Sequence, residues 1–459
     1  MARPSIAPRA HERPFAAHEL FFSTTDRKGL IRNCNQVFVR VSGHPVEALL
    51  GAPHNVIRHP DMPKAVFHLM WGYLEQNRPF AGYVKNLAAD GAYYWVLALV
   101  VPIEGGFLSV RLKPSSELFP VVQGLYAELL AIERAAGTEG GAWRRGMEAA
   151  TTRLHQAIAG LGYDSYDDFM RAAAATELAG FRVASRAAAR GAGIDLGTFA
   201  TSAEACRGVE RGLDDLFSRV DRLLGTIDQL GKAARFVHEL AGDIHLISLN
   251  ALVGSCRLQQ GGERLSVVTE DLAHLSQHCT EHVQGMSTRL RELAGLLSDT
   301  AFSVTAARLQ SAMTADFIRE LARGRQDAPD AALDARLVGD LRTLAVSLGA
   351  STAALVTTLP KAQAPIPGLR RLQHELESDL RRLSSVYLIG AIQAVGIPEA
   401  SMFRELLDRI VGQLERSSAE LAQLSEGVED LRTHLPEFER TAHGARRATQ
   451  TLHQAAHAA

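Results

Sequence analysis

The segment from His54 to Trp95 contains the side chains best suited to bind a small molecule. It is the densest cluster of polar and aromatic residues in a chain otherwise dominated by Ala, Leu and Arg. Arg58 and His59 are adjacent, and a guanidinium group can hold phosphate oxygens through two parallel hydrogen bonds. Amide and aromatic side chains follow, and a flat cofactor ring needs an apolar slot with a few amide groups at its edge. Whatever small molecule the protein senses is therefore expected to bind in this segment.

Local sequence signals place this segment on one helix and one hairpin. Asp61 can serve as the N-cap of a helix, and Pro63 suits its first turn. Apolar residues then recur every three or four positions, as in a helix with one buried face. Asp90-Gly91 lies between two apolar runs and is a strong hairpin signal. These signals predict a helix over residues 64–75 and strands over residues 80–87 and 93–102.

Three further strands and two short helices complete an α+β domain at the N-terminal end. In the last strand Ser109 and Arg111 alternate with apolar residues, which predicts that their face is exposed to solvent. The domain thus has five strands with flanking helices. The additional strands are expected over residues 21–26, 30–33 and 106–112, and the short helices over residues 36–42 and 46–50.

The order of these motifs resembles the PAS domain of bacterial aerotaxis receptors. The resemblance covers about residues 20–115, a quarter of the chain, and assigns a PAS sensor domain to residues 20–118. It implies a five-stranded antiparallel sheet with helices packed across one face, and FAD bound non-covalently as a redox sensor. The residues that carry it are Ser23-Thr24-Thr25-Asp26, Asn35, Val41-Ser42-Gly43, His54-Asn55, the run from Arg58 to Lys64, Val84-Lys85-Asn86, Gly91 and Tyr93-Tyr94-Trp95.

The resemblance and the residue types together assign ten candidate cofactor-binding residues. They are Asn35, His54, Arg58, His59, Asp61, Trp71, Phe80, Asn86, Tyr94 and Trp95. The two asparagines are expected at the edge of the ring, the four aromatic residues as its walls, and Arg58 with His59 at the diphosphate. Phe80 stands where the resemblance implies a tryptophan, so this wall has no indole donor. The alternative is that the aromatic residues are core and that the Arg-His-Asp run is a capping network.

The composition is that of an ordinary soluble protein of about two to four domains, with 459 residues, 46% apolar and 22% charged. A formal net charge of −2 gives no overall field that would recruit nucleic acid or an anionic membrane. The four cysteines do not have the short spacings of a metal site. They are expected to be dispersed free thiols in a reducing compartment. The longest apolar run, residues 94–103, is far shorter than the ~20 residues of a membrane span. We therefore expect a cytoplasmic protein without a membrane span, in which residues 1–19 form a disordered arm.

The remainder of the chain is predicted to be helical. Residues 119–194 are expected to form a helical connector. Residues 195–325 show apolar spacings of three and four on two arms of nearly equal length, which predicts a coiled-coil hairpin. Its turn resembles the cytoplasmic tip of methyl-accepting chemotaxis receptors at Leu249-Asn250-Ala251 and Arg257, although Gly254 replaces a glutamate of that family. In that family the tip binds a histidine kinase and its coupling protein, so the resemblance implies these two partners.

A second, weaker hairpin is expected over residues 326–459. Its first arm contains Pro360, Pro365 and Pro367, which must kink or end a helix. Chemoreceptor hairpins ordinarily pair into a four-helix bundle. Two hairpins in one chain could form that bundle as an intramolecular pseudo-dimer, or each could pair with its twin in a true dimer.

The sequence contains no motif of a known catalytic site. It has no phosphate-binding GxxxxGK[ST] loop, no HExxH and no GxSxG, and we expect no enzyme activity. His274, His278 and His282 recur every four residues, but without a carboxylate at a fixed distance they predict a polar helix face, not a metal site. The favoured hypothesis is a cytosolic redox, oxygen or energy sensor that signals through a chemoreceptor-like helical output. The alternative is a ligand-free PAS docking module on a helical scaffold or oligomerisation rod.

Overall fold

A computed structural model describes residues 6–137, 139, 141–188, 196–255, 262–327, 331–395, 397 and 401–458. The chain divides into two compact units. Unit 1 contains Met1–Phe217, Ala301–Leu355 and Ala442–Ala459, and unit 2 contains Ser218–Thr300 and Val356–Thr441.

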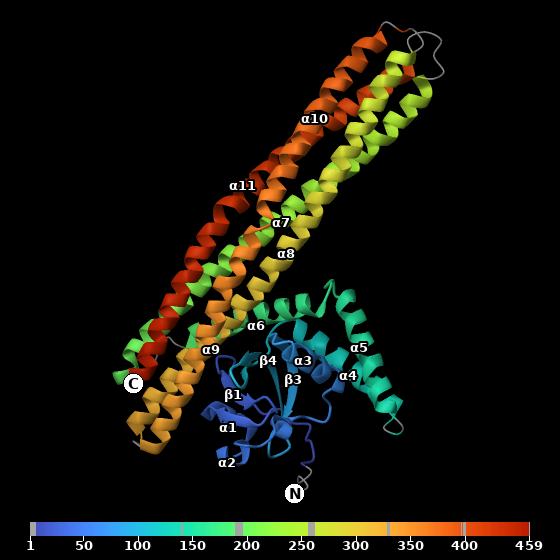
Figure 1. Ribbon diagram of the computed structural model, residues 1–459. Coiled ribbons are helices and arrows are strands. Elements are labelled where there is room, and N and C mark those ends of the chain that lie inside the picture. Colours follow the sequence, from blue (N-terminus) through green and yellow to red (C-terminus); the bar gives the residue numbers. More distant parts are fainter. Residues whose placement is uncertain are drawn as a thin grey trace. The chain divides into compact units, whose positions relative to one another are not determined.

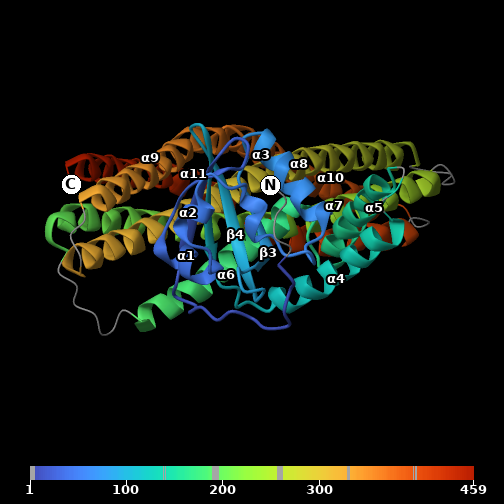
Figure 2. The ribbon, with the colours of Figure 1, turned by 90° about the horizontal axis from the view of Figure 1, so that it is seen from below.

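Unit 1 contains a five-stranded antiparallel sheet with the strand order β2-β1-β5-β4-β3. Its strands are β1 (Phe21–Asp26), β2 (Ile31–Cys34), β3 (Phe80–Leu87), β4 (Tyr93–Ile103) and β5 (Gly106–Leu112). The hairpin partners β3 and β4 lie side by side over the whole of β3 (Figure 1, Figure 2). The predicted five-stranded PAS fold, followed by a mostly helical region, is confirmed.

Short helical segments lie on the face of the sheet that carries Asn86 and Arg111. They are α1 (Gln36–Ser42), α2 (Val46–Leu49), a single 3₁₀ turn (His54–Ile57) and α3 (Lys64–Glu75). Asp61 does not cap α3 as predicted. Instead the carboxylate of Glu133 accepts the first two amides of the helix, at 2.9 Å from Lys64 N and 2.8 Å from Ala65 N. A carboxylate from a distant helix thus satisfies the amides that a local N-cap would otherwise serve.

The opposite face of the sheet is also covered. Side chains alternate along a strand, so Tyr83 and Trp95 point away from the face of Asn86. The ring of Trp95 lies 5.4 Å from that of Phe119, and the Tyr126 hydroxyl donates to the carbonyl of Tyr83. The helices after the sheet are α4 (Leu118–Ala136), α5 (Ala142–Gly160) and α6 (Tyr166–Ala188).

Residues 6–19, expected to form a disordered arm, lie against the hairpin of β3 and β4. Arg9 N donates to Gly91 O at 2.8 Å, and Arg13 N donates to Tyr93 O at 2.7 Å. Phe15 is only 5% exposed and packs edge-on against Phe21. Backbone hydrogen bonds and one aromatic side chain hold this segment in place. Such contacts need no apolar periodicity, so the sequence contains no sign that the segment is ordered.

In the described part of the chain, five long helices follow the connector. They are α7 (Ala200–Ser255), α8 (Gly262–Asp327), α9 (Ala331–Gln363), α10 (Ile366–Val395) and α11 (Ser401–Ala458). The interruption expected at the prolines falls between α9 and α10, with Pro360 inside α9. In unit 2 a single apolar core draws buried side chains from four of these helices, for example Leu230 (α7), Leu290 (α8), Leu380 (α10) and Leu431 (α11). Both expected hairpins therefore contribute to the core of one bundle.

One helical stretch of the described chain, Leu337–Val395, is long and apolar enough to cross a membrane by length and composition. Its most apolar window has a mean hydropathy of 1.4, and 35% of that window is buried in the structure. The sequence analysis placed the longest apolar run in β4 and did not find this stretch. A core helix of a bundle meets the same two criteria.

Candidate functional site

A cavity of about 240 Å³ lies between the sheet and the helices on the Asn86 face. Its sheet side is formed by Thr25, Val84, Asn86, Ala98, Val100, Phe107, Ser109 and Arg111. Its helix side is formed by Lys28, Gly29, Pro53, His54, Asn55, Arg58, Phe67, Met70, Trp71 and Leu74. Most small-molecule pockets measure roughly 300–1,000 Å³. This cavity therefore suits a ring system and is too small to enclose an entire dinucleotide.

Asn86 places an unsatisfied amide in this cavity. Its side chain is 3% exposed, and its Nδ2 has no hydrogen-bond acceptor among the described residues. A buried donor left without a partner costs roughly 1–3 kcal/mol. β3 holds Asn86 opposite Arg58, which forms an isolated backbone bridge with it. The amide is thus held in the cavity with an unused donor, which an acceptor such as a ring carbonyl or ring nitrogen would satisfy.

Arg111 is a cavity residue that the sequence analysis assigned to a solvated face. That prediction is wrong, because the side chain is only 3% exposed. Its guanidinium donates to Ser23 Oγ at 3.0 Å and to Ser109 O at 3.4 Å, and it contacts His54 Nε2. All three partners are neutral acceptors, since burial and then Arg111 itself keep the pKa of His54 well below its usual value. Burial also lowers the pKa of Arg111, to about 10.

The charges that line the cavity have one sign. Lys28, Arg58 and Arg111 are cationic, and no Asp or Glu is among the lining residues of the described chain. The Arg58 guanidinium lies 4.1 Å from the ring of Phe67 and donates to Met62 O, and the carboxylate of Glu133, which does not line the cavity, also interacts with it. Buried cations are ordinarily paired with anions. The cavity therefore favours a ligand that carries or acquires negative charge.

Four of the ten predicted residues line this cavity: His54, Arg58, Trp71 and Asn86. The other six do not line it. They are Asn35, His59, Asp61, Phe80, Tyr94 and Trp95. Their contacts show what each does instead.

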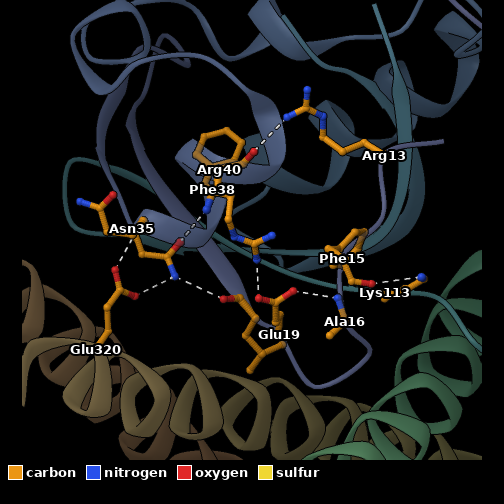
Figure 3. A network of polar contacts seen from close by, with 11 residues as sticks. Arg13, Phe15, Ala16, Glu19, Asn35, Phe38, Arg40, Lys113 and Glu320 are labelled. Carbon is orange, nitrogen blue, oxygen red and sulfur yellow. Dashed lines mark hydrogen bonds and ion pairs between the residues drawn. The ribbon is translucent and has the colours of Figure 1, made fainter. Parts of the chain in front are cut away.

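Asn35 is the N-cap of α1, and its polar atoms have partners within the protein (Figure 3). Its Oδ1 accepts from Phe22 N at 3.2 Å and from Phe38 N at 3.3 Å. Its Nδ2 donates to Leu20 O at 3.2 Å and to Glu320 Oε2 at 3.4 Å. The cofactor role predicted for Asn35 is therefore corrected to a structural one.

His59 and Asp61 form the capping network that was the alternative hypothesis. His59 is 2% exposed, and its Nδ1 accepts from Asp61 N at 3.1 Å. Burial, together with nearby Lys85, lowers the pKa of His59 to about 4, so the ring is neutral and cannot pair with a diphosphate. The Asp61 carboxylate pairs with Lys85 at 2.9 Å and with Arg134 at 3.2 Å.

The three remaining aromatic residues are core side chains. Phe80 stacks on Tyr166 with ring centroids 5.6 Å apart, and Trp95 lies on the far face of the sheet. Tyr94 is fully buried and packs near Phe21, with a hydroxyl that has no hydrogen-bond partner among the described residues. Burial raises the pKa of this hydroxyl above its usual value.

The described residues contain no group of three or more His, Cys, Asp and Glu side chains that could hold a metal ion. Of the three histidines at four-residue spacing, His282 lies 3.2 Å from Asp379 and 3.6 Å from Glu375. These contacts join α8 to α10 within unit 2.

Comparison with known proteins supports the fold and the domain. Residues 31–109 match the model of the PAS fold. The chain is 43% identical over 123 residues to the aerotaxis receptor of Escherichia coli strain K12, covering 26% of this chain and 24% of that protein. It is 29% identical over 96 residues to a nitrogen fixation regulatory protein of Klebsiella pneumoniae, covering 21% of this chain and 18% of that protein. The chain thus matches a quarter or less of each relative, and its N-terminal region is a PAS domain related to the aerotaxis receptor over that region.

Solved structures give lower identities. The light-state LOV domain of the photoreceptor Aureochrome1 is 22% identical, covering 25% of this chain and 90% of that chain with a TM-score of 0.20. A PAS domain from Colwellia psychrerythraea is 23% identical, covering 20% of this chain and 85% of that chain with a TM-score of 0.18.

Proposed function

We propose that the PAS domain binds a flavin, FAD, in this cavity and that the protein senses the redox state of its surroundings. The observation that carries the proposal is the buried Asn86 amide with no partner in a cavity lined by apolar and cationic side chains. The relationship of this region to an aerotaxis receptor supports it. A bound flavin supplies reversible electron transfer. The size of the cavity suits the ring system, with the dinucleotide extending outside.

The cavity residues would have distinct roles toward this ligand. Asn86 donates its amide to the polar edge of the ring, and Trp71 forms an apolar wall at 5.8 Å from the ring of Phe107. Arg111 stabilises negative charge on the ligand, because its present partners are neutral. Lys28 is exposed, so it can reach a phosphate outside the cavity.

Absorption spectroscopy of the purified chain tests the proposal. We expect the visible absorption of oxidised flavin, and release of FAD on denaturation, identified by chromatography. Asn86→Ala and Arg58→Ala should lose the flavin while remaining folded, and Arg32→Ala, which alters an exposed arginine of β2, should retain it. Protein that stays free of flavin after incubation with FAD would instead support the ligand-free docking module.

We propose that the output is a protein contact at the end of unit 2 where α7 and α10 end and α8 begins. Large apolar side chains are 42–73% exposed on α7, α8 and α10: Leu246, Leu249, Val253, Val267, Leu388, Ile389, Ile392 and Val395. Contiguous exposed apolar side chains mark interaction surfaces. The partners that fit are a chemotaxis-type histidine kinase and its coupling protein, located in the cytoplasm.

Binding assays with the purified kinase and coupling protein of the same organism test this output. Leu249→Lys and Ile392→Lys should abolish binding, whereas a lysine at exposed Val183 of α6 should not. Sedimentation of the full chain tests the bundle. A monomer is expected, because both hairpins already share one core, and a discrete dimer would contradict the intramolecular pseudo-dimer.

A further inference from the structure

A carboxylate from α6 is buried beneath the PAS sheet. Glu177 is fully buried, and it accepts the Tyr83 hydroxyl at 2.9 Å. The amides of Ser115 and Ser116, which follow β5, donate to it at 2.6 Å and 3.1 Å. Both serine hydroxyls donate to it as well, at 3.2 Å and 2.6 Å. The five donors surround a single charge, so these contacts, here called the Glu177 clamp, hold three segments together.

The packing of α6 shows that the Glu177 clamp is tight. At Gly180, one turn further along α6, an added Cβ would lie 2.5 Å from Ser115 Oγ. Tyr166, at the start of the same helix, donates its hydroxyl to Ala81 O of β3 at 3.2 Å. Burial, the largest cause, and Glu177 raise the pKa of Tyr83, so its hydroxyl keeps its proton and remains a donor. The helix is thus fixed to β3 at two points by hydrogen bonds.

The Glu177 clamp lies between the cavity and the long helices of unit 1. Tyr83 is adjacent to Val84, a cavity residue, and is three residues from Asn86 on the same strand. Further along α6, Arg182 pairs with Asp214 of α7. Asp214 also pairs with Arg308 of α8 at 2.9 Å. A displacement of β3 therefore has a continuous path of polar contacts to two helices outside the PAS domain.

We propose that Glu177 is the positioning residue that couples the occupancy or charge of the cavity to α6, and through Arg182 to α7. The proposal rests on the proposed function for its natural trigger. A ligand that binds Asn86 pulls on β3, which moves the Tyr83 hydroxyl. The carboxylate is fully buried and therefore out of reach of bulk solvent, so loss of a protein donor is costly and α6 is expected to follow the strand. A path of contacts shows coupling only if a change in the cavity alters the start of α7, and that change can be measured.

Hydrogen exchange of the full chain, read by mass spectrometry, tests the Glu177 clamp. The flavin spectrum is recorded first, so a failure of the proposed function is seen before any exchange is measured. The trigger is reduction of the bound flavin or, in a chain without flavin, Asn86→Asp, which places a charge in the cavity. In the wild-type background the trigger should change exchange at least twofold in residues 196–217, which contain the 3₁₀ turn η3 (Gly197–Phe199) and the start of α7. In Glu177→Gln the change should stop within residues 20–112.

Controls separate coupling from loss of structure. Tyr83→Phe keeps the ring and removes one donor, so it should weaken the response in residues 196–217 while the domain stays folded. It therefore tests the proposal even if Glu177→Gln unfolds the domain. Glu148→Gln alters an exposed carboxylate of α5 and should leave the response intact. An unchanged response in both Tyr83→Phe and a folded Glu177→Gln would overturn the proposal. So would a wild-type chain in which neither trigger alters residues 196–217.

Discussion

Two buried amide side chains, one in each unit, differ in whether their N–H donors have a hydrogen-bond acceptor. Gln373 on α10 of unit 2 is 3% exposed, and its Nε2 donates to Ser425 at 3.1 Å and to Glu377. Asn86 in the PAS domain is equally buried, and its Nδ2 has no acceptor among the described residues. The bundle therefore satisfies this polar group within the chain. In the PAS cavity the Asn86 amide donor stays unsatisfied, which lowers the stability of the domain and leaves the donor available to a ligand.

The charged groups of the two regions differ in the same way. Asp379 in unit 2 is 6% exposed, and the guanidinium of Arg382 lies 3.9 Å from its carboxylate, although Asp379 Oδ2 accepts no hydrogen bond in the described structure. Arg111 in the cavity is 3% exposed and has only neutral hydrogen-bond partners in the described structure. The bundle thus places a cation within ion-pair distance of its buried carboxylate, whereas Arg111 has no carboxylate partner among the described residues, as is typical of a binding site.

The largest expected effect concerns the pH dependence of unit 1. His59 has a pKa of about 4 in the folded domain because it is buried, against about 6.5 in an unfolded chain. The unfolded state takes up the proton first as the pH falls, so stability is lost between pH 6.5 and pH 4, by about 3 kcal/mol. His59→Asn should remove the part of the loss that His59 causes, whereas the part from His54, whose pKa burial also lowers, should remain. All three tryptophans, Trp71, Trp95 and Trp143, belong to unit 1, so fluorescence-detected denaturation measures it.

His68→Asn is the matched control, because His68 is an exposed residue of α3. It should keep the wild-type pH dependence. Equal slopes for wild type and His59→Asn would show that the buried ring does not set the acid stability of the PAS domain.

The second effect concerns the affinity for ligand. Arg111→Met should weaken flavin binding ten- to hundredfold, since a charge-assisted hydrogen bond contributes roughly 1.5–3 kcal/mol. The ligand-free domain should lose less stability than the roughly 3–5 kcal/mol of a broken buried ion pair, because Arg111→Met removes hydrogen bonds to neutral acceptors only. Titration with FAD measures the affinity, and Arg32→Met on β2 is the control. A large loss of ligand-free stability would place Arg111 with the paired charges of the bundle.

The sequence was sufficient to predict where the strands lie, but not to predict whether each face of the sheet is buried. Turn residues and alternation placed β1, β3 and β5 at their observed bounds, because these signals are local. Alternation separates two faces but does not show whether both are covered. Arg111 was therefore assigned to solvent, although β5 is a central strand with helices over both faces. The order of strands in the sheet would have indicated its burial.

The misassigned site residues have partners far away in the chain. Asn35 contacts Glu320, which is 285 residues distant, and the amides that Asp61 was expected to cap are served by Glu133. Polar residue types alone cannot distinguish a ligand contact from such a structural contact. Asn86, Arg58, Trp71 and His54 lie together in the cavity, and the resemblance and the residue chemistry agree on them, so their role toward a cofactor stays a prediction.

The third effect tests the bundle side of the comparison. Gln373→Ala leaves Ser425 and Glu377 without their amide partner, so the free energy of unfolding of unit 2 should fall by about 2 kcal/mol. Unit 2 contains no tryptophan and is helical, so far-UV circular dichroism follows its unfolding. Gln277→Ala, at an exposed position of α8, is the control and should change the stability little.

The smallest effect is the most informative one. Asn86→Ala in the ligand-free chain removes a buried donor that has no acceptor, so the loss of van der Waals contact is offset by the relief of an unsatisfied group. Its effect on the unfolding of unit 1 should be below about 1 kcal/mol, less than that of Gln373→Ala on unit 2. The two measurements together compare equally buried amides with and without a partner. If Asn86→Ala destabilised the ligand-free domain by as much as Gln373→Ala destabilises the bundle, then Asn86 would be a structural amide, and the cavity would lose its main claim to a ligand.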